Sequence, residues 1–556
     1  MKMKKILLYI LINYSLLVVN GFGQYQVEWI RTYPGRIHSS AIDSTGNVYI
    51  TGDNEGNYFL LKYSNNGYLI WQRAISMNNN LNKQRSNPEY QNLNQPNQYN
   101  NKYFINDFSN KIKTGDGNGC MAADSLGNVF ISWSNGNGFL YIYKYDSSGT
   151  QKWRRLYNDT KPDWPKDLAL DYDGNVIVIG ERGLSFTEFL TLKYSSSGNL
   201  IWNKIYYDTI GGFPNKISVD LNNNIYIAGQ ILTNNTFWDM INIKYNNEGV
   251  LQWVSRYNDT LNSGDLAYSI CVDKYGNSYV TGLMTVRLRP NYATDAIGTI
   301  KYTPQGDSVW VRIFHNNDSL QNNYGTDIIT DNSGNVYVSG MTTGNITFSL
   351  AAYATIKYDN NGNMLWIKFN SGDYPPNDIT LDKNKNVYVT GGYNMTTVIY
   401  DSTGNKIWSM SYPSSTSTNG GLKLLFDKNN NLFIPGGVSI DSTILIKVSK
   451  TTSIHSISEN IPDIYRLYQN YPNPFNPSSV IRFQLPVVSN VVLKVYDAMG
   501  REVQTLLNEN LNSGTYSVEF NGEGLSSGIY FYKIEVRSSK SSTGKFTDVK
   551  RMVLLK

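Results

Sequence analysis

The sequence predicts an all-β protein with one large repetitive region followed by one small C-terminal module. Three observations predict this fold class: a ten-residue pattern that begins with Asp returns eight times, a Trp-containing pattern alternates with it, and a different set of alternating strands follows Lys450. A chain of 556 residues is too long for one ordinary domain unless repeats build a single large unit. The repeats therefore decide the organisation of the chain.

The N-terminal segment, residues 1–23, predicts a secretory signal peptide. Three lysines precede an apolar run, and small residues after it place the cleavage near Gly23 or Gln24. The alternative is a membrane anchor, which is less favoured because the run is short and interrupted by Asn13 and Ser15. We expect a mature chain without a transmembrane segment.

The composition disfavours several classes of partner. The chain holds 49 basic and 44 acidic residues, with three of the lysines in the signal peptide, so the mature chain is nearly neutral and offers no electrostatic basis for binding nucleic acid. Two cysteines, Cys120 and Cys271, are too few for a network of disulfides. Export would permit a single bridge, but we favour two buried free thiols in separate repeats.

The first repeated pattern, as in DSTGNVYITG, has Gly three residues after the Asp, replaced by Asn in the copies at Asp220 and Asp427 and by Lys in the copy at Asp382, then Asn and an alternating apolar run. Asp, Gly and Asn are typical of hairpin turns, and the alternation predicts a strand. The eight copies begin at Asp43, Asp124, Asp171, Asp220, Asp273, Asp331, Asp382 and Asp427.

The second pattern, as in YSNNGYLIW, is a Gly turn that leads into a Trp. Together the patterns predict four short strands per repeat: one before the Asp, the alternating run, a Lys-Tyr strand and the Trp strand. A large flat side chain in each repeat suits the space between neighbouring sheets. The Trp strands contain Trp29, Trp71, Trp153, Trp202, Trp253, Trp310, Trp366 and Trp408, and Trp133, Trp164 and Trp238 lie outside the pattern.

The two ends of the repetitive region complement each other. The strand of Trp29 comes before any Asp turn, and the turn at Asp427 has no Trp strand after it. An N-terminal strand that completes the last repeat would close a ring and cover open strand edges. Residues 25–450 therefore predict an eight-bladed β-propeller closed by its N-terminal strand, with an Asn/Gln-rich insertion at 77–114.

The strings AIDSTGNVYITG and LLKYSNNGYLIWQR resemble the bacterial SBBP-type β-propeller repeats. The resemblance covers residues 25–450. It implies the architecture and little chemistry, because the ligands of that family are mostly undefined.

The pattern changes after Lys450. Residues 451–463 predict a polar linker, and residues 464–556 contain several short strands with Gly-rich turns, which predict a small immunoglobulin-like β-sandwich.

Five blocks of this C-terminal module, YPNPFNP, VYDAMGREV, SGTY, LSSGIYFYKI and KRMVLLK, closely resemble the C-terminal (Por) sorting domain of the type IX secretion system of the Bacteroidetes and related bacteria. The resemblance implies passage through the Sec translocon to the periplasm, recognition by the type IX machinery, and release or attachment at the outer surface. An ordinary adhesive domain is the alternative. The matching residues are Tyr471, Pro472, Asn473, Pro474, Phe475, Asn476, Pro477, Tyr496, Asp497, Gly500, Arg501, Gly514, Tyr516, Gly528, Tyr530 and Lys556.

The Asp turns resemble half of a calcium loop, but the bidentate Glu that completes such a loop is missing at the right offset. An Asp that caps its own turn is the better explanation. The three histidines, His38, His315 and His455, are too scattered for a zinc site, and no nucleophile elbow or phosphate loop is present. We therefore expect no metal, no cofactor and no catalytic residue that sequence alone can name.

Lysine precedes Tyr in the third strand of six repeats, at positions 62, 144, 193, 244, 301 and 357. We expect the lysine stems to pack along the sheet while the ammonium groups reach water. A basic ring around the propeller is the alternative.

The links after the second and fourth strands vary widely, whereas the turns after the first and third are short and uniform. Variable loops carry function more often than uniform turns. Besides the insertion 77–114, the candidate binding residues there are aromatic and arginine side chains that suit a glycan or a peptide, unless they only pack their own loops. They are Trp164, Phe237, Trp238, Arg287, Arg289 and Tyr292.

These features predict a secreted or cell-surface protein, exported through the periplasm, that binds or adheres to an extracellular glycan or protein. We favour binding over catalysis. The alternative is an exported polysaccharide hydrolase or lyase with carboxylates at the channel or the variable rim, where only geometry can select the catalytic pair.

Overall fold

The computed structural model describes residues 18–21, 25–75 and 119–555, apart from 136–137, 158–160, 184–186, 208–209, 234–236, 260, 262, 290–291, 316–322, 343–351, 372–373, 393, 413–420, 440–441, 451–454, 459–461, 523–524 and 539–544. Every regular element in this part of the chain is a β-strand, which confirms the all-β prediction. A membrane-spanning helix is therefore not among the described elements. The chain forms two compact units, one of Met1–Asn20 and Val27–Val448 and one of Gly21–Gln26 and Ser449–Lys556.

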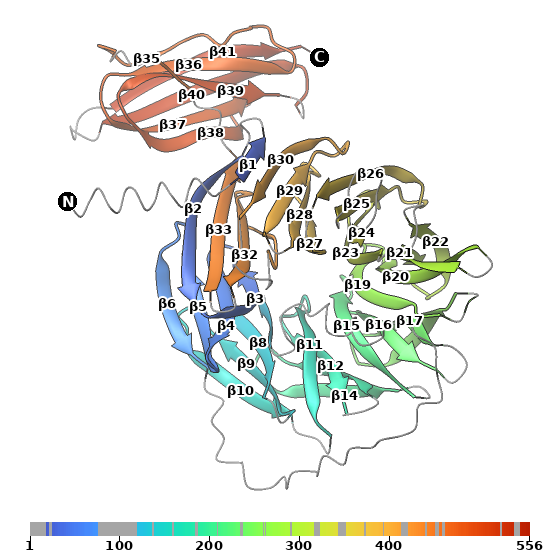
Figure 1. Cartoon of the computed structure of the whole chain (residues 1–556). Helices are drawn as coiled ribbons and strands as arrows, with labels where there is room; N and C mark the ends of the chain where they lie inside the picture. The colour runs from blue at the N-terminus through green and yellow to red at the C-terminus, as the bar shows by residue number, and fades with distance from the viewer. Residues whose placement is uncertain are drawn as a thin grey trace. The chain divides into compact units, whose positions relative to one another are not determined.

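The first unit contains eight antiparallel sheets in its described part, arranged around a common centre (Figure 1). Six of them consist of four consecutive strands that pair in chain order. These are β3 (Arg36–Ile42), β4 (Val48–Asn54), β5 (Asn57–Tyr63) and β6 (Leu69–Ala74); β7 (Gly119–Ala123), β8 (Val129–Ser134), β9 (Leu140–Tyr145) and β10 (Gln151–Tyr157); β11 (Asp163–Leu170), β12 (Val176–Arg182), β13 (Glu188–Tyr194) and β14 (Leu200–Tyr206); β15 (Gly211–Val219), β16 (Ile225–Leu232), β17 (Trp238–Tyr245) and β18 (Leu251–Tyr257); β19 (Leu266–Val272), β20 (Ser278–Arg289), β21 (Tyr292–Tyr302) and β22 (Ser308–Phe314); and β23 (Tyr324–Thr330), β24 (Val336–Thr342), β25 (Ala352–Tyr358) and β26 (Met364–Ser371).

The remaining two sheets of this unit include strands from the N-terminal part of the chain. The seventh is formed by β27 (Pro376–Leu381), β28 (Val387–Gly391), β29 (Thr396–Tyr400) and β30 (Lys406–Ser411), with β1 (Val18–Gly21) paired to β30. The eighth is formed by β31 (Leu425–Phe426), β32 (Leu432–Ser439) and β33 (Ser442–Lys450), with β2 (Tyr25–Pro34) paired to β33. The strand of Trp29 thus completes the last sheet, as the count of Trp strands predicted.

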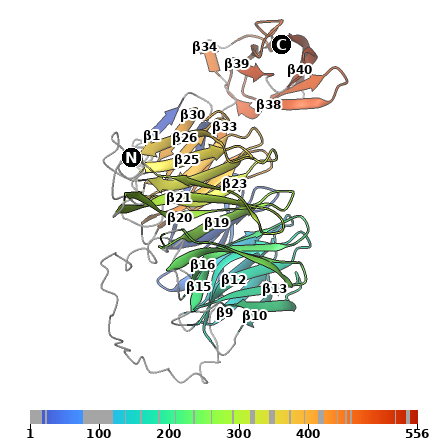
Figure 2. The same cartoon turned by 90° about the vertical axis from the view of Figure 1, so that its right-hand side faces the viewer.

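The strand order defines two ends of the first unit. The first strand of each sheet lies nearest the centre and the fourth lies outermost (Figure 1). In each sheet, the turn between the first and second strands and the turn between the third and fourth strands lie at the same end. We call this end of the unit the turn rim, and we call the opposite end the loop rim. At the loop rim, β20 and β21 form the longest hairpin of the unit, with paired residues from Ser278 and Tyr302 to Arg289 and Tyr292 (Figure 2).

Every Asp turn of the repeats is held by its own side chain. Oδ1 of Asp43 accepts hydrogen bonds from the N–H groups of Thr45 and Asn47, at 2.9 and 3.0 Å, and Oδ2 accepts one from Nδ2 of Asn47 at 2.9 Å. The fourth residue of the turn has a positive φ, as at Gly46 with +84°. Asn223, Lys385 and Asn430 adopt this conformation in the copies that lack the glycine. These bonds agree with the turn interpretation.

Neighbouring sheets of the repeats meet where a Trp of one sheet lies on a glycine turn of the next. A Cβ atom added to Gly149 would lie 2.9 Å from a ring carbon of Trp71, closer than real Cβ atoms pack. The indole Nε1 of Trp71 donates to the carbonyl of Ser147 in the same turn, at 3.2 Å. The same Trp–Gly contact occurs at Gly67, Gly198, Gly249, Gly306, Gly362 and Gly404.

The repeated lysines belong to the same contact. Five of the six are buried, contrary to the expectation that their ammonium groups reach water, and Lys144 is half-buried. Nζ of Lys62 donates to the carbonyl of Ser147, at 3.0 Å, beside the bond from Trp71. Lys62 is buried, because the turn of the next sheet overhangs it, and burial lowers its pKa. Equivalent bonds to the neighbouring turn are made by Lys144, Lys193, Lys244, Lys301 and Lys357.

The last sheet of the repeats joins the first through the same kind of contact. Trp29 lies against Gly67 and packs on Phe433, with ring centroids 5.9 Å apart. Nζ of Lys447 donates to Oδ1 of Asn65 at 2.7 Å. The last sheet is thus joined to the first by the same Trp–Gly and lysine contacts that join consecutive sheets.

The second unit consists of two sheets around one core. One sheet has the order β34 (His455–Ser458), β39 (Gly514–Asn521), β36 (Ser478–Leu485) and β35 (Arg466–Leu467), and the other has β38 (Glu502–Leu511), β37 (Ser489–Asp497), β40 (Gly528–Ser538) and β41 (Lys545–Leu554). Alternate residues of both sheets, such as Phe483, Val495 and Tyr532, are buried between them. The polar segment 451–463, expected as a linker, contains β34, which pairs with β39.

Candidate functional site

The first strands of the repeats, and the residues just before β31, bring eight equivalent positions together at the centre of the first unit. Each lies four residues before a turn Asp, and the set, which we call the inner ring, has no common residue type. Its members are Ser39, Cys120, Asp167, Lys216, Ser269, Asp327, Asp378 and Lys423. Lys216 interacts electrostatically with Asp327 and Asp378 from other sheets, so the members face a shared central region.

The first strands of the repeats are edge strands, so some of their backbone N–H groups have no partner within their own sheet. The register of β15 shifts between Pro214 and Lys216, and that of β27 shifts between Pro376 and Asp378, next to positions of the inner ring. Three members of the inner ring accept N–H groups of the next sheet.

The three carboxylates of the inner ring each accept a backbone N–H from the next sheet. Asp167 accepts from Ile217 at 3.2 Å and Asp327 accepts from Ile379 at 3.1 Å. Asp378 accepts from Leu424 at 2.6 Å. These carboxylates therefore tie the inner strands together, which is a structural role.

Two of these carboxyl groups, Asp327 and Asp378, lie on the first strands of adjacent sheets and interact electrostatically. Burial and the neighbouring Asp327 raise the pKa of Asp378 well above its usual range. Nearby, the Asp167 carboxylate raises the pKa of Lys216. The carboxyl groups of Asp327 and Asp378 already bind backbone N–H groups of the next sheets, so their observed role is structural.

The cysteines lie on first strands of different sheets and are free thiols. Cys120 is in β7 and Cys271 is in β19. Burial raises the pKa of the Cys120 thiol to about 12, which disfavours the reactive thiolate. The described residues contain no group of three or more His, Cys, Asp or Glu side chains placed to hold a metal ion.

At the loop rim, the structure brings two of the predicted binding residues together. Phe237 and Trp238 have ring centroids 6.4 Å apart, and Trp238 packs on Phe213 at 5.3 Å. Phe237 is 42% exposed. Its ring also lies 3.6 Å from the position of a Cβ atom on Gly264, in the loop before β19. We call Phe213, Phe237 and Trp238 the aromatic cluster.

The other predicted binding residues are spread around the loop rim. Trp164 is half-buried in β11, where it pairs with Glu181 across the sheet. Arg287 is exposed near the end of the hairpin of β20 and β21. The side chains of Arg289 and Tyr292 and the whole insertion 77–114 lie outside the described residues.

The loop rim also holds functional candidates that the sequence did not indicate. Tyr268 and Tyr324, on the first strands of adjacent sheets, have ring centroids 5.9 Å apart and both interact with Asp295. Burial raises the pKa of Asp295 to about 6, and burial also raises the pKa of Asp265 to about 7. These tyrosines lie five and seven residues before a turn Asp, so alignment of the first strands alone would have placed them at this rim.

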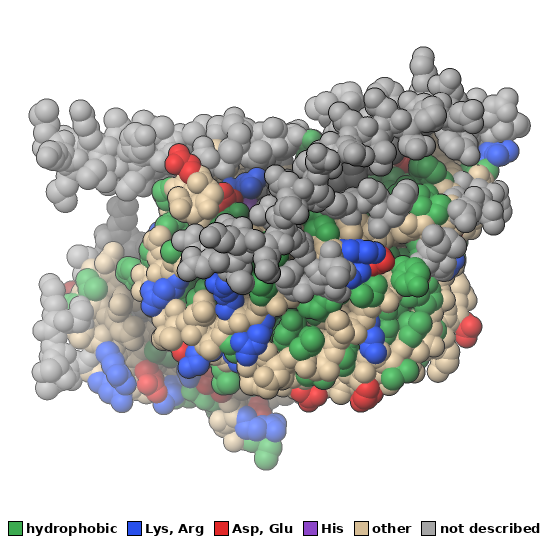
Figure 3. All heavy atoms as spheres, turned by 90° about the horizontal axis from the view of Figure 1, so that it is seen from below, with side chains coloured by type: hydrophobic (Ala, Val, Ile, Leu, Met, Phe, Trp, Pro, Cys, Tyr) green, Lys and Arg blue, Asp and Glu red, His purple; other side chains and the backbone are tan. Residues whose placement is uncertain are grey.

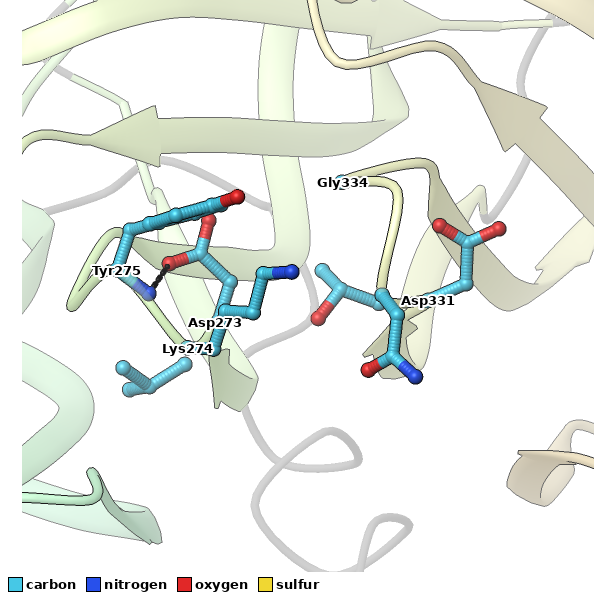
Figure 4. A pocket seen from close by; sticks show the side chains of 8 residues that line it. Asp273, Lys274, Tyr275, Asp331 and Gly334 are labelled. Atoms are coloured by element: carbon cyan, nitrogen blue, oxygen red, sulfur yellow. Dashed lines mark hydrogen bonds between the residues drawn. The ribbon is translucent and has the colours of Figure 1, made fainter.

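The turn rim has a hollow between two Asp turns, lined by Val272, Asp273, Lys274, Tyr275, Thr330, Asp331, Asn332 and Gly334 (Figure 4). Its volume is about 140 Å³. The carboxylate of Asp273 accepts the N–H of Tyr275 at 2.9 Å and the hydroxyl of Tyr279 at 3.0 Å. Since the carboxylates serve their own turns, the hollow offers no free acid to a ligand. On the face of the molecule seen in Figure 3, the described surface mixes hydrophobic side chains with lysine and arginine.

In the second unit, the YPNPFNP block is bonded to the C-terminal strand. Oδ1 of Asn473 accepts the N–H of Val553 at 2.9 Å. The backbone of Phe475 bonds to Val553 and Leu555, and its ring is buried. The first and last of the predicted blocks therefore form one structural element.

The two SG-Tyr blocks of the second unit use the same device. The hydroxyl of Tyr516 donates to the carbonyl of Asn512 at 2.9 Å, and that of Tyr530 donates to the carbonyl of Ser526 at 2.8 Å. Each tyrosine thus closes the bend that precedes its strand.

The comparison with known families identifies this second unit. Residues 469–547 match the family described as a secretion system C-terminal sorting domain. The chain carries a secretion sorting domain. The sorting domain indicates export through the type IX system to the cell surface or the extracellular space.

The sorting domain accounts for a minority of the chain, and the repeats have weaker similarities. Virginiamycin B lyase from Staphylococcus aureus is 13% identical, with a TM-score of 0.37, over 77% of this chain and 99% of that one. The WD40 domain of Pan2 from Neurospora crassa is 11% identical, with a TM-score of 0.38, over 60% of this chain and 89% of that one. Neither similarity carries an argument about activity. No curated protein matches the chain.

Proposed function

We propose that this chain is a secreted or cell-surface β-propeller that binds an extracellular glycan or protein at its loop rim. It reaches that location through the Sec translocon, with residues 1–23 as a signal peptide cleaved near Gly23 or Gln24, and then through the type IX machinery. The observation that carries this proposal is the sorting domain on a repeat unit whose aromatic cluster, with Phe237 exposed, lies at the rim of the variable loops.

The proposed architecture is an eight-bladed β-propeller of SBBP-type repeats over residues 25–450 and an immunoglobulin-like sandwich over 464–556. The eight sheets and the pairing of β2 with β33 support closure of the ring by the N-terminal strand. Removal of residues 1–23 would also remove β1, so each blade of the mature chain would have four strands.

Export is tested by removing the sorting domain. Deletion of Ile464–Lys556 is expected to leave the protein in the periplasm of the native host, while the full chain reaches the surface or the medium. Cell fractionation and protease accessibility distinguish these locations. Delivery of the truncated chain to the surface would refute the role of the sorting domain.

Binding is tested with the full mature chain on glycan and peptide arrays. Replacement of Phe237 and Trp238 by alanine is expected to reduce binding at least tenfold, because aromatic side chains supply much of the contact energy with sugar rings and peptides. Tyr275→Ala is the matched control, since this exposed aromatic side chain lies on the turn rim. Equal loss in both variants, or no binding by the full mature chain, would contradict the proposed surface.

A second candidate function, cleavage of a polysaccharide, has one specific observation in its favour. Asp295 has a pKa near 6 and lies beside Tyr268 and Tyr324, so it can hold a proton at mildly acidic pH. Asp295→Asn is expected to abolish release of oligosaccharides from a cleaved polysaccharide while binding persists. If the full chain releases no product from any polysaccharide that it binds, the binding function alone remains.

A further inference from the structure

Asp295 carries a carboxyl group that nothing in the described part of the chain neutralises. It lies in β21 near the loop rim and is half-buried. Burial is the one cause of its raised pKa of about 6, so no described cation and no described donor offsets the loss of water around the carboxylate. The group is mostly ionised at neutral pH. Asp171, by contrast, is buried with Lys193 as its partner at 2.8 Å.

Two tyrosines from neighbouring first strands lie beside this carboxyl group. Tyr268 in β19 and Tyr324 in β23 have ring centroids 5.9 Å apart, and their planes meet at 76°. Both interact electrostatically with Asp295, and Tyr324 also interacts with Tyr374. Strand β23 contacts both β19 and β21, so three elements build this arrangement. We call Asp295, Tyr268, Tyr324 and Tyr374 the tyrosine site.

The tyrosine site is open to a ligand at part of its surface. Tyr268, Tyr374 and Asp295 are each half-buried, whereas Tyr324 is 5% exposed. A ring that is covered by its neighbours, next to rings and a carboxylate that are still accessible, forms a fixed wall for an incoming group.

The chemistry of the tyrosine site favours an organic cation. The face of an aromatic ring attracts a positive charge, and a carboxylate that lacks a partner attracts it more strongly. The same groups repel an anion. A metal ion would need several oxygen or nitrogen ligands, and the described residues contain no group of three that could hold one. A planar guanidinium suits the site better than an ammonium, because it stacks on a ring while its N–H groups reach a carboxylate.

The aromatic cluster lies close to the tyrosine site along the chain. The ring of Phe237 lies 3.6 Å from a Cβ atom added to Gly264, and Gly264 precedes Tyr268 by four residues. Four residues span about 14 Å at most. An extended peptide of four or five residues therefore reaches both places, with an apolar side chain at one and a cationic side chain at the other.

We propose that the tyrosine site binds the guanidinium group of an arginine side chain on an extracellular protein. The guanidinium plane stacks on a tyrosine ring, and its N–H groups donate to the carboxylate of Asp295. A neighbouring apolar side chain of the same segment contacts the aromatic cluster. This inference rests on the proposed binding function, names a protein as the ligand, and assigns Asp295 to recognition instead of polysaccharide cleavage.

The test compares two small probes on the full mature chain, N-acetyl-arginine amide and N-acetyl-citrulline amide, which has nearly the same shape and no charge. Titrations followed by ligand-observed NMR are expected to show at least tenfold tighter binding of the arginine probe. Asp295→Asn is expected to remove this preference, and Tyr268→Leu to weaken arginine binding about tenfold. Asp307→Asn is the matched control, since it neutralises an exposed carboxylate at the turn-rim end of the same strand, and its binding should be unchanged.

The pH dependence gives a second readout. The titratable groups that face Asp295 are tyrosines, and burial raises the pKa of Tyr268 and Tyr324 further above the ordinary value, so they stay neutral from pH 5 to 8. Protonation of Asp295 is therefore expected to make arginine binding about tenfold weaker at pH 5 than at pH 7.5. Asp295→Asn should abolish this dependence.

Thermal unfolding separates a recognition role from a structural one. Asp295→Asn removes a half-buried charge without a described partner, so its melting temperature should equal or exceed that of the unaltered chain. A lower melting temperature together with lost binding would assign Asp295 a structural role and overturn the inference.

The remaining outcomes are equally decisive. Equal affinity for the two probes, no binding of either, or arginine binding that survives Asp295→Asn would overturn the inference. Tighter binding of glucosamine than of the arginine probe would assign the site to a glycan and also overturn it. In each case, array binding that depends on Phe237 and Trp238 would still support the proposed function, whereas loss of all array binding would refute that function itself.

Discussion

The indole of Trp29 lies on the backbone of Gly67, so that a Cβ atom there would come within 2.8 Å of the ring. Trp29 is in β2 of the last sheet and Gly67 is in the turn after β5 of the first. The contact therefore joins the two ends of the repeat region through the same geometry that joins consecutive sheets.

Substitution of Gly67 by alanine tests the strength of this contact. Gly67→Ala is expected to cost about 1–3 kcal/mol from overpacking in addition to about 1–2 kcal/mol for a left-handed conformation. Gly56→Ala is the control, because Gly56 has φ +80° but nothing within 4 Å of its added Cβ atom. Denaturant unfolding followed by tryptophan fluorescence reports on the repeats alone, since every Trp precedes residue 450. Equal losses in the two variants would show that the Trp contact contributes nothing.

The buried pair Lys193 and Asp171 gives a second prediction. Their charged atoms are 2.8 Å apart and both side chains are almost fully buried. Lys193→Met is expected to destabilise the repeats by about 3 kcal/mol, because it leaves a buried carboxylate without its cation. Lys152→Met, which removes an exposed ammonium 3.7 Å from Asp146, is expected to change stability by less than about 1 kcal/mol. A similar effect of both substitutions on the denaturation midpoint would contradict this assignment.

Asp265 predicts a dependence of stability on pH. Its unfolded pKa is about 3.9 and burial raises its folded pKa to about 7, so between these pH values the folded state keeps a proton that the unfolded state has released. The contribution of Asp265 to stability is therefore fully present below about pH 4 and falls as pH rises to about 7. Asp265→Asn is expected to remove this slope, measured as the pH dependence of the unfolding free energy relative to the unaltered chain. An unchanged slope would contradict the raised pKa.

Asp378 predicts a contrast between two substitutions. An amide at this position can still accept the N–H of Leu424, and it is uncharged like the protonated acid that burial and the neighbouring Asp327 favour. Asp378→Asn is therefore expected to change stability by less than about 1 kcal/mol at pH 7, whereas Asp378→Ala leaves the N–H of Leu424 unpaired and costs about 1–3 kcal/mol. The free energies of unfolding of the two variants, measured by chemical denaturation, distinguish these outcomes. A large loss with the amide would contradict the raised pKa of Asp378.

The regular parts of the fold could be predicted because the repeats carry local signals. The Asp turn depends on residues within one hairpin, such as Asp43 and Asn47, and the strands around it alternate with period two. The completion of the last sheet by the strand of Trp29 could be inferred from counting alone. Each of these features requires only residues that are near in sequence or repeated.

The inner ring and the burial of the lysines could not be predicted in the same way. The ring positions hold Ser, Cys, Asp and Lys, so no repeated residue type marks them, and their contacts join different sheets. The lysines recur in sequence, but their burial depends on the turn of the next sheet. Lys62, for example, donates to a carbonyl in that turn, which is 85 positions away in the sequence. The sequence predicted two members of the aromatic cluster, Phe237 and Trp238. It did not indicate Phe213, which packs on Trp238 from another strand.

The pairing of β2 with β33 has a mechanical consequence for a protein delivered outside the cell. Once residues 1–23, and β1 with them, are removed as proposed, the chain enters the repeat region through one strand of this sheet and leaves it through the adjacent strand. A pulling force applied between the two ends of the chain would thus be borne by the hydrogen bonds and side-chain contacts of a single sheet, and the other seven would carry load only after that sheet had opened. Resistance to extraction and to digestion from either end should accordingly depend on this one sheet more than on the number of repeats.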